Sequence, residues 1–247
     1  MTFDLALVIP CYNEAKRFDW LTFSNFTKDH SNIMLMFVND GSTDETHSIL
    51  EKFKSAHKNS VHHLSLDENK GKAEAVREGL NYALQNCHTP LVGYWDADLS
   101  TPLSEVSRFI EVFEANKTID AVFGSRVKLL GRSIERRFVR HYLGRIFATF
   151  ASTVLKLPIY DTQCGAKILR ASEELQSCIQ KPFITKWIFD VELIARLKLA
   201  KGRTPCSSYI YELPLNRWVE VGGSKVKPSD FFIAIYQIAK IFRKYRN

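Results

Sequence analysis

The chain has 247 residues, of which 45% are hydrophobic, 25% charged and 12% aromatic. These fractions are typical of a folded globular protein and exclude disordered, collagen-like and disulfide-scaffold classes. No apolar run reaches the roughly 18 residues of a membrane-spanning helix, and the N-terminus has neither a basic stretch nor a cleavage site, so we expect no transmembrane segment and no secretory signal. The five cysteines are scattered, which favours free thiols in the cytoplasm.

The positive charge of the chain is concentrated in two segments. Lysine and arginine number 34 and aspartate and glutamate 27, for a net charge of +7. Residues 126–145 contain seven basic residues and one acid, and residues 231–247 contain four basic residues and no acid. Both segments are also rich in apolar residues, which is a composition suited to an anionic membrane surface, a phosphorylated ligand or nucleic acid.

In the first half of the chain, short apolar runs alternate with helical patterns. Strands are predicted at 4–10, 33–38, 61–66, 90–95 and 119–124. Helices are predicted between them, at 14–28, 43–57, 72–86 and 102–115. Ser42 and Glu45 form a capping-box pattern for the second of these helices. The alternation predicts an α/β fold with a mostly parallel sheet flanked by helices, and ligands bound beyond the carboxyl ends of the strands.

The second half is less regular. An Arg-rich helix is predicted at about 133–157, with Arg132, Arg136 and Arg140 on one helical face. The elements predicted after it are a strand at 164–170, helices near 171–180 and 187–200, and a strand at 206–213. Without a repeat or a linker, residues 1–229 are expected to form one domain.

The last segment, residues 230–247, has the pattern of a basic amphipathic helix. Apolar residues recur in it at spacings of three and four, at Phe231, Ile235, Ile238, Phe242 and Tyr245. Its basic residues mostly fall on other faces, as in helices that lie in a membrane interface. The alternative is a C-terminal helix that packs on the core and exposes a charged face.

The strongest local motif is Asp96-Ala97-Asp98, which follows an apolar strand. Two carboxylates on the same side of an extended chain repel each other unless a cation lies between them. Such oxygen ligands suit Mg²⁺ or Mn²⁺, and the ion would in turn bind a diphosphate. A solvated acidic turn is the alternative.

Further polar or turn-forming residues lie at the ends of the first three strands or just after them: Pro10, Tyr12, Glu14, Asp40, Gly71 and Lys72. At its strand tip, Asp40 is placed to accept a hydrogen bond from a base N–H, and Lys72 opens a helix where it can meet a phosphate or a base oxygen. An ordinary turn or helix cap is the alternative for each. The chain lacks the P-loop and the G-x-G-x-x-G pattern, which disfavours simple ATP hydrolysis and a nicotinamide dehydrogenase.

Chemistry-bearing residues also occur in the second half. Arg126 closes the fifth predicted strand. Asp190 and Glu192 lie in an apolar helical pattern, where carboxylates are costly unless they are paired with Arg or Lys or are functional. The segment 222–225 (Gly-Gly-Ser-Lys), with Arg217 upstream, has the composition of a mobile anion clamp or of an ordinary turn.

In their order along the chain, these motifs resemble those of the family 2 inverting glycosyltransferases of the GT-A fold. The matching segments are VIPCYNE, NDGSTDET, NKGKAEAVREG, DADLS and GSR. Three further segments, DTQCGAK, WIFDVEL and WVEVGGSK, are similar to the branch that makes polyprenyl-phosphate sugars, most closely the dolichyl-phosphate β-glucosyltransferases. The resemblance implies a single GT-A (Rossmann-like) domain with a nucleotide-binding half at 1–125 and an acceptor half at 126–229.

The resemblance also implies roles for individual residues. Those expected to bind the nucleotide are Pro10, Tyr12, Glu14, Asp40, Gly71, Lys72 and Asp96. Those expected to bind the metal ion are Asp96 and Asp98. Those expected at the donor phosphate or the acceptor are Arg126, Gln163, Glu192 and Ser224. Those expected to be catalytic are Asp190, Arg217 and Lys225. Ser100 stands where mannosyl relatives carry a metal-binding Gln, which weakens a mannosyl interpretation.

The implied function is that of a metal-dependent, inverting hexosyltransferase in cell-envelope glycan biosynthesis. With Mg²⁺ or Mn²⁺, it would move a glucose-like sugar from a nucleotide sugar, preferably UDP-linked, to a polyprenyl or dolichyl phosphate. It would work in the cytoplasm, peripherally on the cytoplasmic face of the membrane, and no nucleic acid is expected as a partner. A lipid phosphate is already anionic, whereas a hydroxyl acceptor would need a base, for which Asp190 is the first candidate.

Two other functions remain open. One is a soluble family 2 transferase that acts on a glycan hydroxyl in polysaccharide synthesis. The other is a non-catalytic binder of a nucleotide sugar or of nucleic acid, although the intact acidic and basic motifs favour an enzyme.

Overall fold

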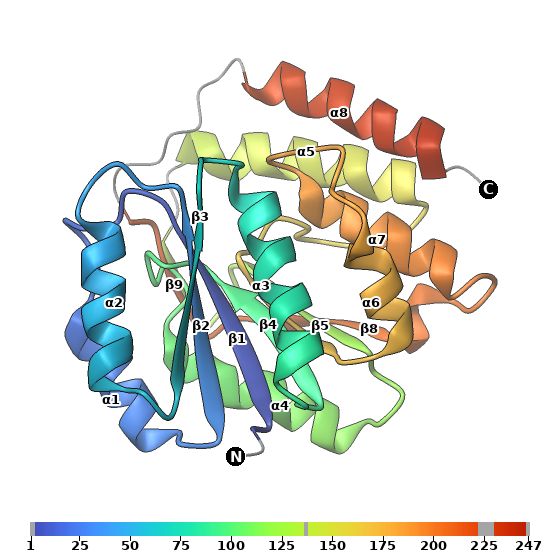
Figure 1. The fold of residues 1–247 in the computed structure, drawn as a ribbon. Coiled ribbons are helices and arrows are strands. Elements are labelled where there is room, and N and C mark those ends of the chain that lie inside the picture. The colour runs from blue at the N-terminus through green and yellow to red at the C-terminus, as the bar shows by residue number, and fades with distance from the viewer. Residues whose placement is uncertain (1–2, 136–137, 222–229, 246–247) are drawn as a thin grey trace. The chain divides into compact units, whose positions relative to one another are not determined.

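The computed structural model describes residues 3–135, 138–221 and 230–245 (Figure 1). The chain forms two compact units, Met1–Leu99 with Ile168–Pro182, and Ser100–Lys167 with Phe183–Asn247. The predicted division into halves at residue 125 stays a prediction. The predicted boundary at residue 229 lies outside the described residues.

The first unit is built on parallel strands. They are β1 (Leu5–Cys11), β2 (Ile33–Asp40), β3 (Val61–Leu66) and β4 (Leu91–Trp95), in the spatial order β3-β2-β1-β4. In the register of this sheet, Leu5 lies opposite both Ile33 and Leu91. Every residue of β2 and β4 is buried, as expected for parallel strands covered on both faces.

Helices cover both faces of these strands (Figure 1). The helices of this unit are α1 (Trp20–Asp29), α2 (Thr46–Ala56), α3 (Lys72–Asn86) and α6 (Glu173–Gln180). On one face, rings from α1, β2 and α2 pack edge to face, with the centroid of Phe37 5.1 Å from that of Phe23 and 5.5 Å from that of Phe53. On the other face, the buried Arg77 of α3 donates to the carbonyl of Ile179 in α6 at 3.3 Å.

The predicted capping box at Ser42 and Glu45 is wrong. Helix α2 begins later, at Thr46, and Glu45 makes no side-chain cap. Asp44 takes this part, since its Oδ1 accepts the Thr46 N–H at 3.0 Å. The Ser42 Oγ instead accepts the Asn13 N–H at 3.0 Å, which links the loops that follow β1 and β2.

The second unit contains strands that pair in parallel. These are β5 (Ala121–Ser125) with β8 (Ile210–Pro214), and β6 (Ser133–Glu135) with β9 (Arg217–Val219). Strand β7 (Ala166–Arg170) contributes residues to both units. Seven of the described strands belong to one sheet, and β6 and β9 form a second. These features confirm the α/β class with a mostly parallel sheet.

The longer helices of the second unit are α4 (Val106–Ala115), α5 (Phe138–Leu155), α7 (Phe189–Ala200) and α8 (Asp230–Tyr245). Short 3₁₀ turns lie at Leu103–Glu105 and Cys206–Ser208. The C-terminal helix α8 packs against α5 and α7, with Ile238 and Ile241 buried. It exposes Lys240, Arg243 and Lys244, which matches the alternative of a C-terminal helix that packs on the core and exposes a charged face.

Two predicted elements of the second half have different bounds. The helix predicted at 133–157 is preceded by strand β6 and begins only at Phe138. Arg132 therefore lies before β6 and does not share a helical face with Arg140, while Arg136 lies outside the described residues. The strand predicted at 206–213 begins at Ile210, because residues 206–208 form a 3₁₀ turn.

Candidate active site

The acidic motif lies where the buried strand β4 ends. The chain turns directly after the strand, and the Leu99 N–H donates to the Asp96 carbonyl at 3.2 Å with Leu99 at a φ of +53°. The carboxylates of Asp96 and Asp98 belong to this turn, and the side chain of Asp96 is 33% exposed. Lys72, the first residue of α3, pairs with Asp96 through an Nζ–Oδ1 distance of 2.5 Å. The structure thus brings together three residues that the sequence predicts for the donor site.

A second cation belongs to this cluster and was not predicted. Arg17 forms a two-bond ion pair with Glu14, with Nη2 2.6 Å from Oε1. The hydrogen bonds to Glu14 raise the pKa of Arg17 against the effect of burial, and the charges of Asp98 and Asp96 raise it further. The positive charge of Arg17 therefore interacts with the charges of both carboxylates of the acidic motif. The sequence signal was only an Arg three residues after Glu14, which is common on exposed turns.

The acidic turn fits a divalent ion that arrives with its ligand. No group of three or more His, Cys, Asp or Glu side chains within residues 3–135, 138–221 and 230–245 is arranged to hold a metal ion. Asp96 and Asp98 provide two carboxylates, and Mg²⁺ is commonly bound by one or two carboxylates together with substrate phosphates and water. The donor set therefore suits a metal–diphosphate complex better than a permanently resident ion.

Asp40 shapes the loop that opens α3. Its side chain is buried at 3% exposure, and its two oxygens accept the backbone N–H groups of Lys70 at 2.8 Å and Gly71 at 2.9 Å. Gly71 caps α3 with a φ of +94°, a conformation open to glycine. Asp40 thus holds Gly71 and Lys72 in place. Its predicted contact with a nucleobase stays a prediction.

The loop after β1 is held by Asn13, a residue to which the sequence pattern assigns no role. Asn13 has a φ of +54°, and its Oδ1 accepts the Thr43 N–H at 2.9 Å. Pro10 lies in β1, Tyr12 is half-buried beyond it, and Glu14 is engaged with Arg17. Asn adopts the left-handed region more often than most residues, but the sequence alone does not show that Asn13 does so. The predicted nucleoside contacts of Pro10, Tyr12 and Glu14 stay predictions.

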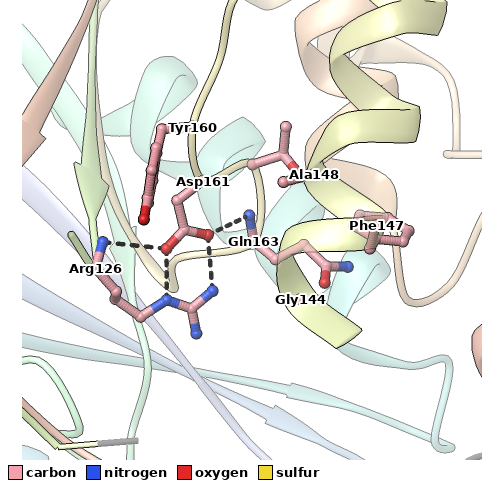
Figure 2. Close-up of a pocket in the computed structure, with 8 residues that line it drawn as sticks. Arg126, Gly144, Phe147, Ala148, Tyr160, Asp161 and Gln163 are labelled. Carbon is pink, nitrogen blue, oxygen red and sulfur yellow. Dashed lines mark hydrogen bonds and ion pairs between the residues drawn. The ribbon is translucent and has the colours of Figure 1, made fainter. Parts of the chain in front are cut away.

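In the second unit, Arg126 is fixed by Asp161 (Figure 2). The two side chains meet edge to edge, with Nε 2.6 Å from Oδ2 and Nη2 2.7 Å from Oδ1. The Arg126 backbone N–H also donates to Oδ2, and the guanidinium lies over the Trp218 ring at 5.3 Å. A bidentate pair of this kind sets both the position and the orientation of the guanidinium.

Asp161 is itself held by a carboxylate behind it. Glu212 accepts the backbone N–H groups of Tyr160 and Asp161, both at 2.8 Å, and burial raises the pKa of Glu212. The Gln163 N–H donates to Asp161 at 3.2 Å. Neither Asp161 nor Glu212 was assigned a role from the sequence, although Asp161 lies in the segment DTQCGAK.

These residues border a pocket. Figure 2 shows Arg126 and Asp161 with Tyr160 on one side and helix α5 on the other. The residues that line it are Arg126, Gly144, Phe147, Ala148, Tyr160, Asp161, Thr162 and Gln163. The pocket therefore combines a polar floor with an apolar wall, and it includes Arg126 and Gln163 from the predicted set.

Asp190 is engaged in an internal ion pair. It lies in the first turn of α7 at 5% exposure, and its Oδ1 is 2.6 Å from Nζ of the fully buried Lys167. Lys167 also donates to the Cys164 carbonyl at 2.6 Å. This is the structural pairing that the sequence left open, and it leaves the predicted catalytic role of Asp190 without support from its surroundings.

Glu192 is fully buried in a similar network. It accepts bonds from the Ile184 N–H at 2.8 Å, Arg196 at 2.6 Å and the Tyr245 hydroxyl at 2.8 Å. These contacts stabilise α7 and anchor the end of α8. The predicted place of Glu192 in the acceptor pocket stays a prediction that its burial does not support.

The remaining predicted residues lie near the end of the chain. Arg217 begins β9 and is exposed, and its backbone N–H donates to Glu105 at 3.2 Å. Ser224 and Lys225 lie outside the described residues.

Among the helices that the structure describes, none has the length and apolar character needed to cross a bilayer.

Comparison with known sequences places these motifs in a wider group. A model of the glycosyl transferase family 2 matches residues 6–174. The chain is 29% identical over 250 residues to the dolichyl-phosphate beta-glucosyltransferase of Dictyostelium discoideum, covering 96% of this chain and 72% of that protein. It is also 29% identical over 250 residues to the dolichyl-phosphate beta-glucosyltransferase of Saccharomyces cerevisiae, covering 90% and 69%.

Comparison with solved structures supports the fold. The glucosyl-3-phosphoglycerate synthase of Mycobacterium tuberculosis, solved with Mn²⁺, UDP and phosphoglyceric acid, superposes with a TM-score of 0.67 at 17% identity. The match covers 98% of this chain and 78% of that one. At this identity, the likeness shows a shared fold.

Proposed function

Since the chain belongs to glycosyltransferase family 2, we propose that it transfers glucose from UDP-glucose to a polyprenyl phosphate such as dolichyl phosphate, with inversion at the anomeric carbon. The observation that carries the proposal is the alignment of 96% of the chain with a dolichyl-phosphate beta-glucosyltransferase. Intact acidic and basic motifs at the strand ends support an enzyme over a silent binder. We assign donor binding to residues of the first unit and acceptor binding to residues of the second.

The donor's diphosphate is assigned to the turn after β4. Asp96 and Asp98 would hold Mg²⁺ or Mn²⁺, and a solved structure of the same fold was obtained with Mn²⁺ and UDP. When bound, the divalent ion supplies positive charge that stabilises the leaving diphosphate. Lys72, at the start of α3, can exchange its bond to Asp96 for one to a phosphate oxygen. The N-terminus of α3 adds partial positive charge at the same place.

The nucleoside is assigned to the loops that follow β1, β2 and β3. Tyr12 offers a ring for stacking on the base, and Pro10 and Glu14 flank it. We assign Asp40, whose carboxylate accepts the backbone N–H groups of Lys70 and Gly71, to the edge of the base. An N–H of a uracil ring is a suitable partner for this carboxylate.

The acceptor is assigned to the second unit, where Arg126, Gln163, Arg217, Ser224 and Lys225 would bind and orient a phosphate. A phosphate oxygen is anionic at neutral pH, so it can attack the anomeric carbon without a general base. The ion pair of Asp190 with Lys167 supports this type of acceptor, because a carboxylate at 5% exposure is poorly placed to take a proton from a hydroxyl. Orientation by positive groups is then the main contribution of the protein.

We further propose that the enzyme contacts the cytoplasmic face of a membrane peripherally. Helix α8 exposes three basic residues near its end, and each contributes on the order of 1 kcal/mol near an anionic surface. Co-sedimentation with anionic vesicles should therefore be clear at low salt and weaken as salt rises. Absence of binding at low salt would contradict this part of the proposal.

The function is tested with two panels of substrates. UDP- and GDP-linked sugars with Mg²⁺ or Mn²⁺ are first compared by the thermal shift that they cause. The best donor is then offered to a short polyprenyl phosphate, to the matching polyprenol and to water-soluble glycans. Transfer from UDP-glucose to the phosphate alone is expected. Transfer to a glycan and not to the phosphate would indicate a polysaccharide-type transferase instead.

A further inference from the structure

The loop after β1 carries a cation, Arg17, whose place in the chain is fixed on both sides. Before it, the Glu14 N–H donates to Oγ1 of Thr46 at 2.8 Å, which ties the loop to the start of α2. After it, the ring of Phe18 stacks on that of the buried Phe23 with 5.2 Å between the centroids. The backbone at Arg17 is therefore held before any ligand binds.

The guanidinium of Arg17 is oriented by a carboxylate that is almost fully buried. The side chain of Glu14 is 8% exposed, and it accepts from Nε and from Nη2, the latter at 2.6 Å. These bonds use two of the five N–H groups of an arginine, and the other three have no acceptor among the described residues. Since the side chain of Arg17 is 36% exposed, these groups can reach a ligand.

The loop that carries Arg17 follows β1, and the acidic motif follows β4. These two strands are parallel neighbours in the sheet, so the loop and the motif leave the same edge of the first unit. The hydrogen bonds to Glu14 raise the pKa of Arg17, and the charges of Asp98 and Asp96 raise it further. The fixed guanidinium therefore lies close enough to both carboxylates for their charges to interact.

The balance of charge in this cluster depends on Arg17. The two aspartates of the acidic motif and Glu14 carry three negative charges, and Lys72 and Arg17 supply two positive ones. A divalent ion at the motif would leave the cluster with a single net positive charge. Without Arg17 the charges would only cancel, so this residue provides the positive excess that favours a diphosphate.

We infer that Arg17 donates hydrogen bonds to the diphosphate of the sugar donor and that Glu14 is the positioning residue that orients it. The inference rests on the proposed function. When the bond between the anomeric carbon and the β-phosphate oxygen breaks, its electron pair stays on that oxygen, while a phosphate oxygen of the acceptor bonds to the carbon. The diphosphate thereby gains one negative charge, and a guanidinium already fixed in place stabilises that charge as it develops.

The first test replaces Arg17 with Gln, which removes the charge and keeps an amide that can bond to Glu14. In the presence of Mn²⁺, the affinity for UDP should fall roughly 10-fold or more, as expected for the loss of a hydrogen bond between charged groups. The affinity for uridine, which has no diphosphate, should be unchanged. Lys16→Gln removes an equal charge from the exposed neighbouring residue and should change neither affinity in calorimetry. An equal loss for uridine and UDP would contradict the contact with the diphosphate.

The second test asks whether Glu14 acts through Arg17. Glu14→Gln keeps the charge of Arg17 and weakens its orientation, so kcat should fall by a larger factor than KM for UDP-glucose rises. The double variant Glu14→Gln with Arg17→Gln should have the kcat of Arg17→Gln alone, because nothing is left for Glu14 to orient. It also removes both charges of the pair, which favours a folded protein if Arg17→Gln alone is unstable. Effects on kcat that multiply in the double variant would show that Glu14 acts independently.

The outcomes separate the inference from the proposed function. A wild type that binds no UDP in the presence of Mn²⁺ would contradict the proposed function itself. A wild type that binds UDP, together with an Arg17→Gln variant that binds it as tightly as Lys16→Gln does, would show that the role of Arg17 is wrong while the function stands.

Discussion

The Nζ of Lys72 lies 2.5 Å from Oδ1 of Asp96, so the lysine expected at the donor's phosphate is paired with a carboxylate expected at the metal ion. Such a pair makes the two ligands interdependent. A divalent ion that binds Asp96 alone must displace the lysine, whereas an ion that arrives with a diphosphate brings a new partner for it. The arrangement therefore favours binding of the metal and the nucleotide together.

Replacement of Lys72 by Met should separate these two effects. Without the ammonium group, Mn²⁺ alone should bind more tightly, because it no longer competes with the ion pair. In the presence of Mn²⁺, UDP should bind Lys72→Met at least about 10-fold more weakly than the wild type, as expected for the loss of a hydrogen bond to a charged group. Calorimetry measures both affinities, and the exposed Lys70→Met is the control. Unchanged affinities in Lys72→Met would contradict the assignment.

A pair of glycines tests the close approach of the loops after β2 and β3. Gly41 and Gly202 have similar φ angles of +59° and +60°. A Cβ on Gly41 would lie 2.3 Å from the Glu68 carbonyl carbon, whereas a Cβ on Gly202 would meet nothing within 4 Å. Gly202→Ala should cost about 1–2 kcal/mol of unfolding free energy from the backbone alone. Gly41→Ala should lower the unfolding free energy clearly more than Gly202→Ala does. Equal losses of unfolding free energy in urea would show that the two loops move apart to accept the added methyl group.

The sequence predicted those parts of the site that depend on a local pattern. Asp96 and Asp98 follow a strand whose residues are all apolar, and the alternation of elements requires strand ends to share one edge. The support of Asp161 by Glu212 could not be predicted, because partners 51 residues apart leave no local signal. Arg17 was missed because an Arg three residues after a Glu is common on exposed turns and does not by itself indicate a site. The start of α5 was missed because residues 133–135 pair with β9, a tertiary contact that overrides helical periodicity.

The ion pair of Asp190 with Lys167 confounds the simplest test of a catalytic base. Asp190→Asn removes the negative charge 2.6 Å from the fully buried ammonium of Lys167, which should cost about 3–5 kcal/mol of stability. The double variant Asp190→Asn with Lys167→Met removes both charges and should recover most of that loss in denaturant unfolding. A double variant as unstable as the single one would contradict this view of the pair.

The same double variant tests the chemistry. If Asp190 is structural, the double variant that recovers its stability should also transfer glucose to the polyprenyl phosphate. Its kcat should then lie within about 10-fold of the wild-type kcat. A lost general base would instead lower kcat by roughly 10²–10⁴-fold. A loss of that size in a stable double variant would restore Asp190 as the base.

Stability should decrease on mild acidification. Burial lowers the pKa of His62, and the charge of Lys54 lowers it further. The unfolded chain, with an ordinary His pKa of about 6.5, then takes up a proton before the folded protein does, so unfolding free energy falls as pH drops through that value. The slope is at most about 1.4 kcal/mol per pH unit for each proton.

His62→Gln should flatten this dependence between pH 7.5 and pH 5.5. Part of the slope should remain, because burial also lowers the pKa values of His57 and His63. Urea unfolding at several pH values measures the slope, and the exposed His88→Gln provides the control. An equal slope in His62→Gln and the wild type would contradict the assignment.

The most direct test of the whole account is calorimetric titration of UDP into the wild type and into Asp98→Asn, with and without Mn²⁺. The wild type should bind UDP at least about 10-fold more tightly when Mn²⁺ is present. Asp98→Asn should lose this enhancement while it retains its Tm, and the exposed Asp29→Asn should behave as the wild type. Binding of UDP that is equally tight without the ion, or an enhancement that survives in Asp98→Asn, would show that the carboxylates after β4 do not hold the donor's metal.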